Sequence, residues 1–202
     1  PKGTYFITSP IVLKDYVNLV GENFGTTVIK KNNTASTGGI DCVIYGKDKR
    51  RFTISQLSVD GCDTTGKVIA DATSIGFYMS GCNYFGIEKS TARFCLVGYS
   101  FVTCWVFEVS QATAQQCLQY GFSTASSTTS GVFTNTTAWG CGGGWSLFAS
   151  VYMQLIGCAC DHSDAGQKAD DPFLPFGSGG NYQAPAFIFF VSACQGLTII
   201  SP

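Results

Sequence analysis

Short apolar runs alternate with turn-forming residues along the N-terminal part of the chain. The runs at 5–7, 11–13, 17–20 and 27–29 are rich in β-branched or aromatic side chains. Each run is bounded by Gly, Pro, Asn, Asp or Ser, which is typical of short strands and turns and not of helices. The stretch GENFG at 21–25 separates two of these runs. We therefore interpret it as a corner between two short strands.

The same pattern recurs with a fixed period in the middle of the chain. The segment GFYMSGCNYFGIEKSTARFCL, which begins at Gly76, aligns with GYSFVTCWVFEVSQATAQQCL, which begins at Gly98. The positions that match at an offset of 22 are Cys82 and Cys104, Phe85 and Phe107, Ile87 and Val109, Thr91 and Thr113, Ala92 and Ala114, Cys95 and Cys117, and Leu96 and Leu118. At an offset of 24, Val109, Thr113, Ala114 and Cys117 fall on Phe133, Thr137, Ala138 and Cys141. Upstream, residues 52–62 fit the same template if Leu57 and Val59 take the places of Phe85 and Ile87.

A period of this length indicates a solenoid whose repeats bury their apolar faces by stacking on one another. The regular leucines and asparagines of leucine-rich repeats are absent, and helical repeats are longer and poorer in Gly, Ser and Thr. We therefore predict an all-β, parallel β-helix of seven to nine coils, with about 22 residues in each coil. It forms a single domain over 1–202, interrupted by an irregular excursion at 165–185 that contains three prolines and four glycines. The start at Pro1, without Met, is typical of a fragment of a longer chain.

Composition narrows the choice of partners. Hydrophobic residues make up 45% and charged residues 12% of the 202 residues, with 12 Lys and Arg against 13 Asp and Glu. A near-zero net charge argues against nucleic acid as a partner. No apolar run is long enough for membrane insertion, and the N-terminus lacks the layout of a signal peptide.

The ten cysteines include no C-x-x-C pair. Stacking of equivalent positions predicts buried ladders of Cys82 over Cys104 and of Cys95 over Cys117, and we favour reduced thiols over disulfides. The cluster CACDH at 158–162 contains the single His of the chain, and we interpret it as turn or core residues. No metal and no cofactor is therefore expected.

Two stretches carry a family likeness. GTYFITSPIVLKDYVNLVGENFGTTVIKK and RRFTISQLSVDG resemble the first coils of the pectate-lyase-like, right-handed parallel β-helix superfamily. Within that superfamily the chain is similar in character to bacteriophage tailspike proteins. The resemblance implies assembly in the host cytoplasm, a place on the virion as part of a homotrimer, and action on bacterial surface polysaccharide.

Glycan hydrolysis requires two carboxylates, and the alternation of inward and outward positions selects candidates. With Phe85 and Ile87 inward, Glu88 is predicted to point outward. Glu108 lies between inward Phe107 and Val109 and is predicted to point outward as well. With Val59 aligned on Ile87, Asp60 becomes the neighbour of Glu88. Asp60, Glu88 and Glu108 are thus predicted to form an acidic stripe over three coils.

A second carboxylate set remains open. Asp161 and Asp164 end a predicted strand at a turn, where carboxylates often converge. For either set, the alternative is a non-catalytic role as solvated surface residues or as turn caps. The aromatic side chains predicted to contact sugar rings are Trp105, Trp139, Trp145 and Tyr78; Trp139 and Trp145 flank GCGGG, whose glycines are expected to leave both rings accessible.

The sequence thus predicts a tailspike-like polysaccharide depolymerase that hydrolyses internal glycosidic bonds of an O-antigen or capsule at the cell surface. One alternative is a non-catalytic receptor-binding or structural β-helix of a virion. Another is a secreted polysaccharide lyase, which would require Ca²⁺ and an arginine base. Arg93 lies near a turn and away from the predicted stripe, which disfavours the lyase.

Overall fold

All regular secondary structure in the described part of the chain is β. The structure, a computed structural model, describes residues 1–31, 36–61, 74–161 and 189–200. The excursion predicted at 165–185 lies outside these ranges. The strands are β1 (Gly3–Ile7), β2 (Ile11–Val12), β3 (Leu19–Val20), β4 (Thr27–Lys31), β5 (Ser36–Thr37), β6 (Ile40–Lys47), β7 (Thr53–Asp60), β8 (Ile75–Ser80), β9 (Asn83–Arg93), β10 (Val97–Val102), β11 (Trp105–Ser110), β12 (Thr113–Gln115), β13 (Tyr120–Ala125), β14 (Thr129–Thr134), β15 (Thr137–Trp139), β16 (Gly143–Phe148), β17 (Gln154–Ile156), β18 (Ala159–Asp161), β19 (Phe189–Ser192) and β20 (Thr198–Ile200).

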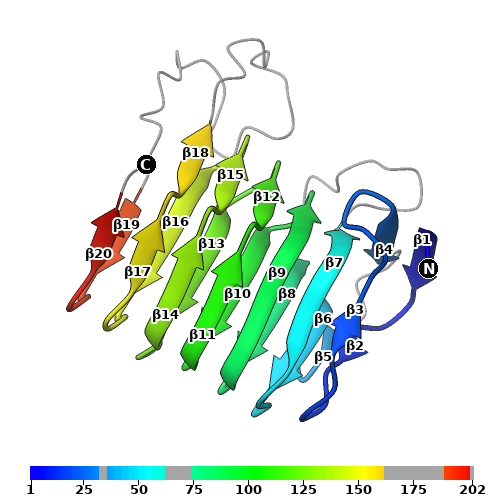
Figure 1. Cartoon of the computed structure of the whole chain (residues 1–202), viewed down its shortest axis with the longest axis horizontal. Coiled ribbons are helices and arrows are strands. Elements are labelled where there is room, and N and C mark those ends of the chain that lie inside the picture. Colours follow the sequence, from blue (N-terminus) through cyan, green and yellow to red (C-terminus); the bar gives the residue numbers. More distant parts are fainter. Residues whose placement is uncertain (32–35, 62–73, 162–188, 201–202) are drawn as a thin grey trace.

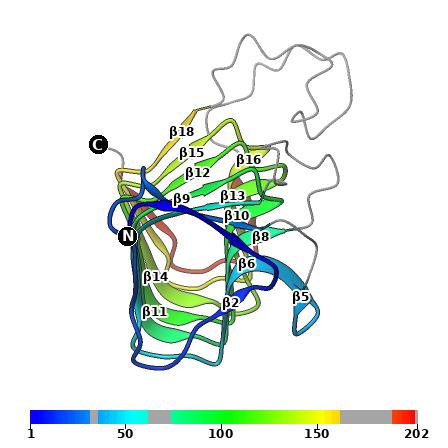
Figure 2. The ribbon, with the colours of Figure 1, turned by 90° about the vertical axis from the view of Figure 1, so that its right-hand side faces the viewer.

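The strands stack into two long sheets that face each other across one core (Figures 1 and 2). One sheet has the order β1-β4-β7-β9-β11-β14-β17-β20, and β12, β15 and β18 extend it beside the second half of β9. The other has the order β19-β16-β13-β10-β8-β6-β2. All neighbours along both orders are parallel, and within the described ranges only the short pair β5 and β6 is antiparallel. The chain is therefore a parallel β-helix, as predicted.

Strand register confirms the internal repeat. Phe85 pairs with Phe107 and Ala92 pairs with Ala114, each 22 positions away. The looser copy is confirmed as well, because Val109 pairs with Phe133 at an offset of 24.

The upstream alignment was wrong by several residues. Leu57 pairs with Ser90 and Val59 with Ala92, whereas Ile54 pairs with Ile87. The cause is a bend in β7 at Gln56, whose φ is 57°. Leu57 and Val59 follow this bend and so belong to the next side of the coil.

Each complete coil turns at corners where one residue adopts a left-handed backbone conformation. In the coil that contains β8 and β9, these residues are Gly81, Tyr84, Lys89 and Phe94. The next coil repeats the pattern at Thr103, Val106, Gln111 and Gln116. Such a conformation costs a non-glycine residue about 1–2 kcal/mol. Hydrogen bonds between coils offset the cost: the Thr103 N–H donates to the carbonyl of Ala125 at 3.0 Å, and the Gln116 N–H donates to that of Trp139 at 2.8 Å.

Small side chains follow several of these corners and turn into the core. The thiols of Cys95, Cys117 and Cys141 each donate a hydrogen bond to the carbonyl two residues earlier, at 3.2–3.7 Å. All nine described cysteines are free, which agrees with the predicted thiol ladders. Burial raises the pKa of the Cys42 thiol to about 12, so this thiol stays protonated and unreactive at neutral pH.

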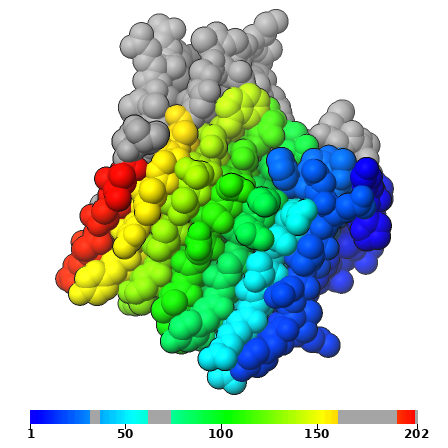
Figure 3. All heavy atoms as spheres, viewed as in Figure 1, coloured from blue at the N-terminus to red at the C-terminus, as the bar shows by residue number. Residues whose placement is uncertain are grey.

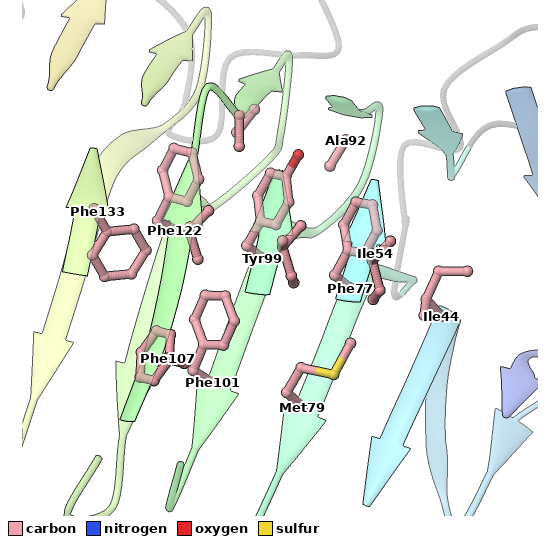
Figure 4. Packing of buried hydrophobic residues seen from close by; sticks show 14 of the residues in the cluster. Ile44, Ile54, Phe77, Met79, Ala92, Tyr99, Phe101, Phe107, Phe122 and Phe133 are labelled. Atoms are coloured by element: carbon pink, nitrogen blue, oxygen red, sulfur yellow. The ribbon is translucent and has the colours of Figure 1, made fainter. Parts of the chain in front are cut away.

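Stacked aromatic rings fill the core between the sheets (Figure 4). Tyr99 lies between Phe77 and Phe122, with ring centroids 4.7 and 4.9 Å away, and Phe122 stacks on Trp145 at 5.2 Å. Trp145 is fully buried, so the predicted accessibility of its ring was wrong. Its register with Phe122 explains this position.

Candidate functional site

Two of the predicted carboxylates share one outer face of the solenoid. This carboxylate face is the outer side of the first half of β9 together with β11, β14 and β17, which form parallel bands in Figure 3. Phe107 and Val109 are buried in the core, and Glu108 between them is exposed. The same alternation on β9 leaves Glu88 exposed. The predicted outward orientation of both glutamates is confirmed.

The two glutamates lie on neighbouring strands but are offset along them. Glu108 pairs with Gly86, and Glu88 pairs with Ser110. A lateral step of about 4.8 Å and a two-residue step of about 6.6 Å place the two Cα atoms about 8 Å apart. Gly86 leaves the surface beside Glu108 open, because a Cβ atom there would meet only Thr53, at 4.0 Å. The face therefore presents two solvated carboxylates around a gap.

Asp60 does not belong to this face, and its predicted pairing with Glu88 was wrong. It pairs with Arg93, and Ser55 is the neighbour of Glu88. The Asp60 side chain is 2% exposed, and its oxygens accept hydrogen bonds from Arg93 Nε at 2.7 Å and Nη2 at 3.1 Å. Lys30 Nζ lies 3.5 Å from the same carboxylate. Asp60 therefore makes the contacts of a buried structural ion pair.

Exposed aromatic rings line the corner that leads onto the carboxylate face. Trp105, predicted as a sugar contact, is 38% exposed. Tyr84 and Tyr152 are 56% and 66% exposed and adopt left-handed conformations, as does Val106. Sequence reasoning missed both tyrosines. The available signal was a tripeptide that recurs as NYF, WVF and VYM. In each copy the middle residue directly precedes an inward apolar side chain.

The remaining predicted residues lie elsewhere. Tyr78 is on β8 in the opposite sheet, where its ring stacks on Tyr45 at 5.8 Å. Trp139 is partly buried on β15, and its backbone pairs with that of Asp161 on β18. Asp164 lies outside the described residues. Trp139 and Asp161 are thus neighbours in register, on a side of the coil different from that of Glu88.

Trp139 and Asp161 end a row of register neighbours that crosses six strands. The row, which we call the Trp139 column, consists of Lys30, Asp60, Arg93, Gln115, Trp139 and Asp161. The preceding buried alanines, Ala92, Ala114 and Ala138, point into the core, so the column from Arg93 to Trp139 faces outward. Beside it runs a row of threonines at Thr91, Thr113 and Thr137.

Among the described residues, no three His, Cys, Asp or Glu side chains are grouped so as to hold a metal ion. The same part of the chain contains no helix of the length and apolarity that a membrane span requires.

Several solved structures share the fold at low sequence identity. ORF18 of Geobacillus virus E2 matches with a TM-score of 0.67 and 16% identity, over 83% of this chain and 35% of that one. The A-module of the mannuronan C-5 epimerase AlgE6 from Azotobacter vinelandii matches with a TM-score of 0.54 and 18% identity, over 78% and 53% of the two chains. The catalytic domain of a GH87 α-1,3-glucanase, solved with tetrasaccharides, matches with a TM-score of 0.58 and 15% identity, over 80% and 32%.

The chain thus spans about a third of the viral and glucanase chains. A search of curated protein sequences finds no match. The model of the family "Rhamnogalacturonase A/epimerase, pectate lyase-like" matches residues 1–144, which include the carboxylate face from Glu88 to Glu108. The chain therefore belongs to this pectate-lyase-like family.

Proposed function

We propose that the chain is the β-helix of a phage tailspike-like depolymerase, which hydrolyses internal glycosidic bonds of a bacterial surface polysaccharide. The observation that carries the proposal is the pair Glu88 and Glu108, exposed on neighbouring strands of one face. Membership of the pectate-lyase-like family and the fold shared with a viral protein support it.

In this proposal Glu88 and Glu108 divide the acid and base roles of hydrolysis. One protonates the leaving oxygen, and the other activates a water molecule. Inverting glycosidases hold their two carboxyl groups about 6.5–9.5 Å apart, and retaining enzymes about 5–5.5 Å apart. With Cα atoms about 8 Å apart, the two flexible side chains can reach either spacing. NMR of the first product anomer distinguishes the two outcomes.

The exposed rings supply binding surface along the axis of the solenoid. Trp105 and Tyr84 lie on the same two strands as the glutamates, at the end nearer the corner. An aromatic face packs against the apolar face of a pyranose, and it does so at low entropic cost because the side chain has two torsions. A glycan along this corner would therefore run across the coils and bring a bond over the gap beside Gly86.

The chain offers a matched control for the catalytic test. It contains three glutamates, and Glu22 is exposed near Lys2 on a different part of the surface. The full-length protein is incubated with lipopolysaccharide or capsule from candidate hosts, and product size is measured. Glu88→Gln and Glu108→Gln should each abolish shortening, whereas Glu22→Gln should retain it. Shortening that survives both substitutions would overturn the site.

The rival carboxylate set is tested in the same assay. If Asp161→Asn abolishes shortening while the two glutamate variants remain active, the reaction belongs to the end of the Trp139 column. Tight binding without shortening on any host would support the non-catalytic receptor-binding alternative. A product with an unsaturated terminal sugar would indicate a lyase, for which Arg93 is poorly suited because its guanidinium is bound to Asp60.

We further propose that the full-length protein is a homotrimer on the virion. Sedimentation equilibrium of the full-length protein should give three times the chain mass, and a monomer would contradict this.

A further inference from the structure

We propose a second glycan subsite on the Trp139 column, one that binds a sugar carrying a negatively charged substituent. It rests on the proposed function in one respect, namely that the ligand is a polysaccharide. It lies on a different side of the coil from Glu88 and Glu108, and it does not require that they cleave anything.

The first observation is charge. Lys30, Asp60 and Arg93 are register neighbours on β4, β7 and β9. At this end of the column, two cations against one carboxylate leave one net positive charge, and Asp161 lies at the other end, three strand steps (about 14 Å) from Arg93. The Arg93 side chain is 32% exposed and the Lys30 side chain 21%. Asp60 binds Nε and Nη2 of Arg93, which orients the guanidinium. Its remaining donor group is therefore available to an external anion.

The second observation is a row of hydrogen-bonding groups beside that charge. Gln115 follows Arg93 in the column, and Thr113 and Thr137 flank it on β12 and β15. All three side chains are partly exposed. Within the described part of the chain, none of the three side chains makes a hydrogen bond. Amide and hydroxyl groups at the spacing between strands suit the hydroxyl groups of successive sugars.

The third observation is the aromatic ring at the end of this row. Trp139 is partly exposed and lies two strands from Arg93, a distance of about 10 Å. A pyranose stacked on Trp139 would place the next sugar over Gln115 and the charged substituent of the one after beside Arg93. The column thus orders stacking, hydrogen bonding and charge along one line.

The expected ligand is therefore an anionic polysaccharide. Probes are oligosaccharides of polygalacturonate, hyaluronan and colanic acid, each beside its carboxyl-reduced counterpart. Binding is measured by titration calorimetry with the protein at low salt. At least one acidic probe should bind at least tenfold more tightly than its reduced form. Equal affinity for the acidic and reduced forms of all three, or no binding to any acidic probe, would overturn the proposal.

Variants locate the binding on the column. Trp139→Ala and Gln115→Ala should each lower the affinity for the acidic probe about tenfold. Trp105→Ala, on the corner beside the carboxylate face, should leave this affinity unchanged. Removing Arg93 alone would leave Asp60 buried with fewer partners, so the charge is removed as a pair with the double variant Asp60→Asn, Arg93→Gln. This variant should fold and lose the preference for the acidic probe. A preference that persists in the folded double variant would contradict the role of Arg93.

The outcome is separable from that of the proposed function. Loss of polysaccharide shortening in Glu88→Gln with intact acidic binding would support both conclusions. Acidic binding by a protein that shortens no polysaccharide would leave the subsite standing and remove the catalytic proposal.

Discussion

Replacement of Asp60 by Ala tests the buried ion pair that this residue forms with Arg93 and Lys30. The side chain is 2% exposed and accepts two hydrogen bonds from Arg93, at 2.7 and 3.1 Å, with Lys30 at 3.5 Å. Breaking a fully buried ion pair costs about 3–5 kcal/mol. Here the freed cations can reach solvent, because 32% and 21% of their side chains are exposed. We therefore expect a loss near the lower limit, about 3 kcal/mol.

Urea-induced unfolding followed by tryptophan fluorescence measures this loss, and buried Trp145 provides the signal. Glu88→Ala is the control, since exposed substitutions usually change stability by about 0.5 kcal/mol or less. The two variants should therefore differ by more than 2 kcal/mol in the free energy of unfolding. Asp60→Ala within 0.5 kcal/mol of the unmodified protein would refute the buried ion pair.

Three further predictions concern the core, the corners and the thiols. Phe122→Ala, which removes a ring stacked between Tyr99 and Trp145, should cost about 4 kcal/mol in urea unfolding, whereas Phe148→Ala, at a 48% exposed ring, should cost under about 1.5 kcal/mol; equal losses would contradict the core assignment. Val106→Asn should stabilise the protein by about 1 kcal/mol, because Asn tolerates the left-handed conformation at φ 53° better than a β-branched residue does. Val106→Ala is the control, and a lower melting temperature for Val106→Asn than for Val106→Ala would count against the corner geometry. The Cys42 pKa is raised by burial from 9.0 to about 12, so the thiol ionises first in the unfolded chain and stability falls as the pH rises from about 9 towards 12. Cys42→Ala should show a shallower fall in melting temperature across this range, and identical slopes for the two proteins would contradict the raised pKa.

Much of the fold was predictable because a solenoid's structural repeat requires a repeat of the same length in the sequence. Stacked coils place equivalent residues one above another, so Phe85 and Phe107 must match in size and polarity. Alternation along a strand then fixed which side chains point outward, and Glu88 and Glu108 were placed correctly for that reason.

The errors come from features that side-chain pattern does not encode. The bend in β7 lies at Gln56, a residue type that is not typical of turns. Because of this bend, Asp60 lies on the next side of the coil. The glycines of GCGGG predict an accessible Trp145 ring, and this prediction is wrong because Trp145 is buried. Instead, a Cβ atom at Gly144 would lie 2.9 Å from Cys160 Sγ, and one at Gly143 the same distance from Tyr120 Cδ1. These glycines allow close packing around the coil.

The most direct test of the central claim is the size of a host surface polysaccharide after incubation with the full-length protein and its variants. The unmodified protein and Glu22→Gln should shorten the polysaccharide, whereas Glu88→Gln and Glu108→Gln should bind it without shortening it. Shortening by both glutamate variants at the unmodified rate would show that the bond is not cleaved at the carboxylate face.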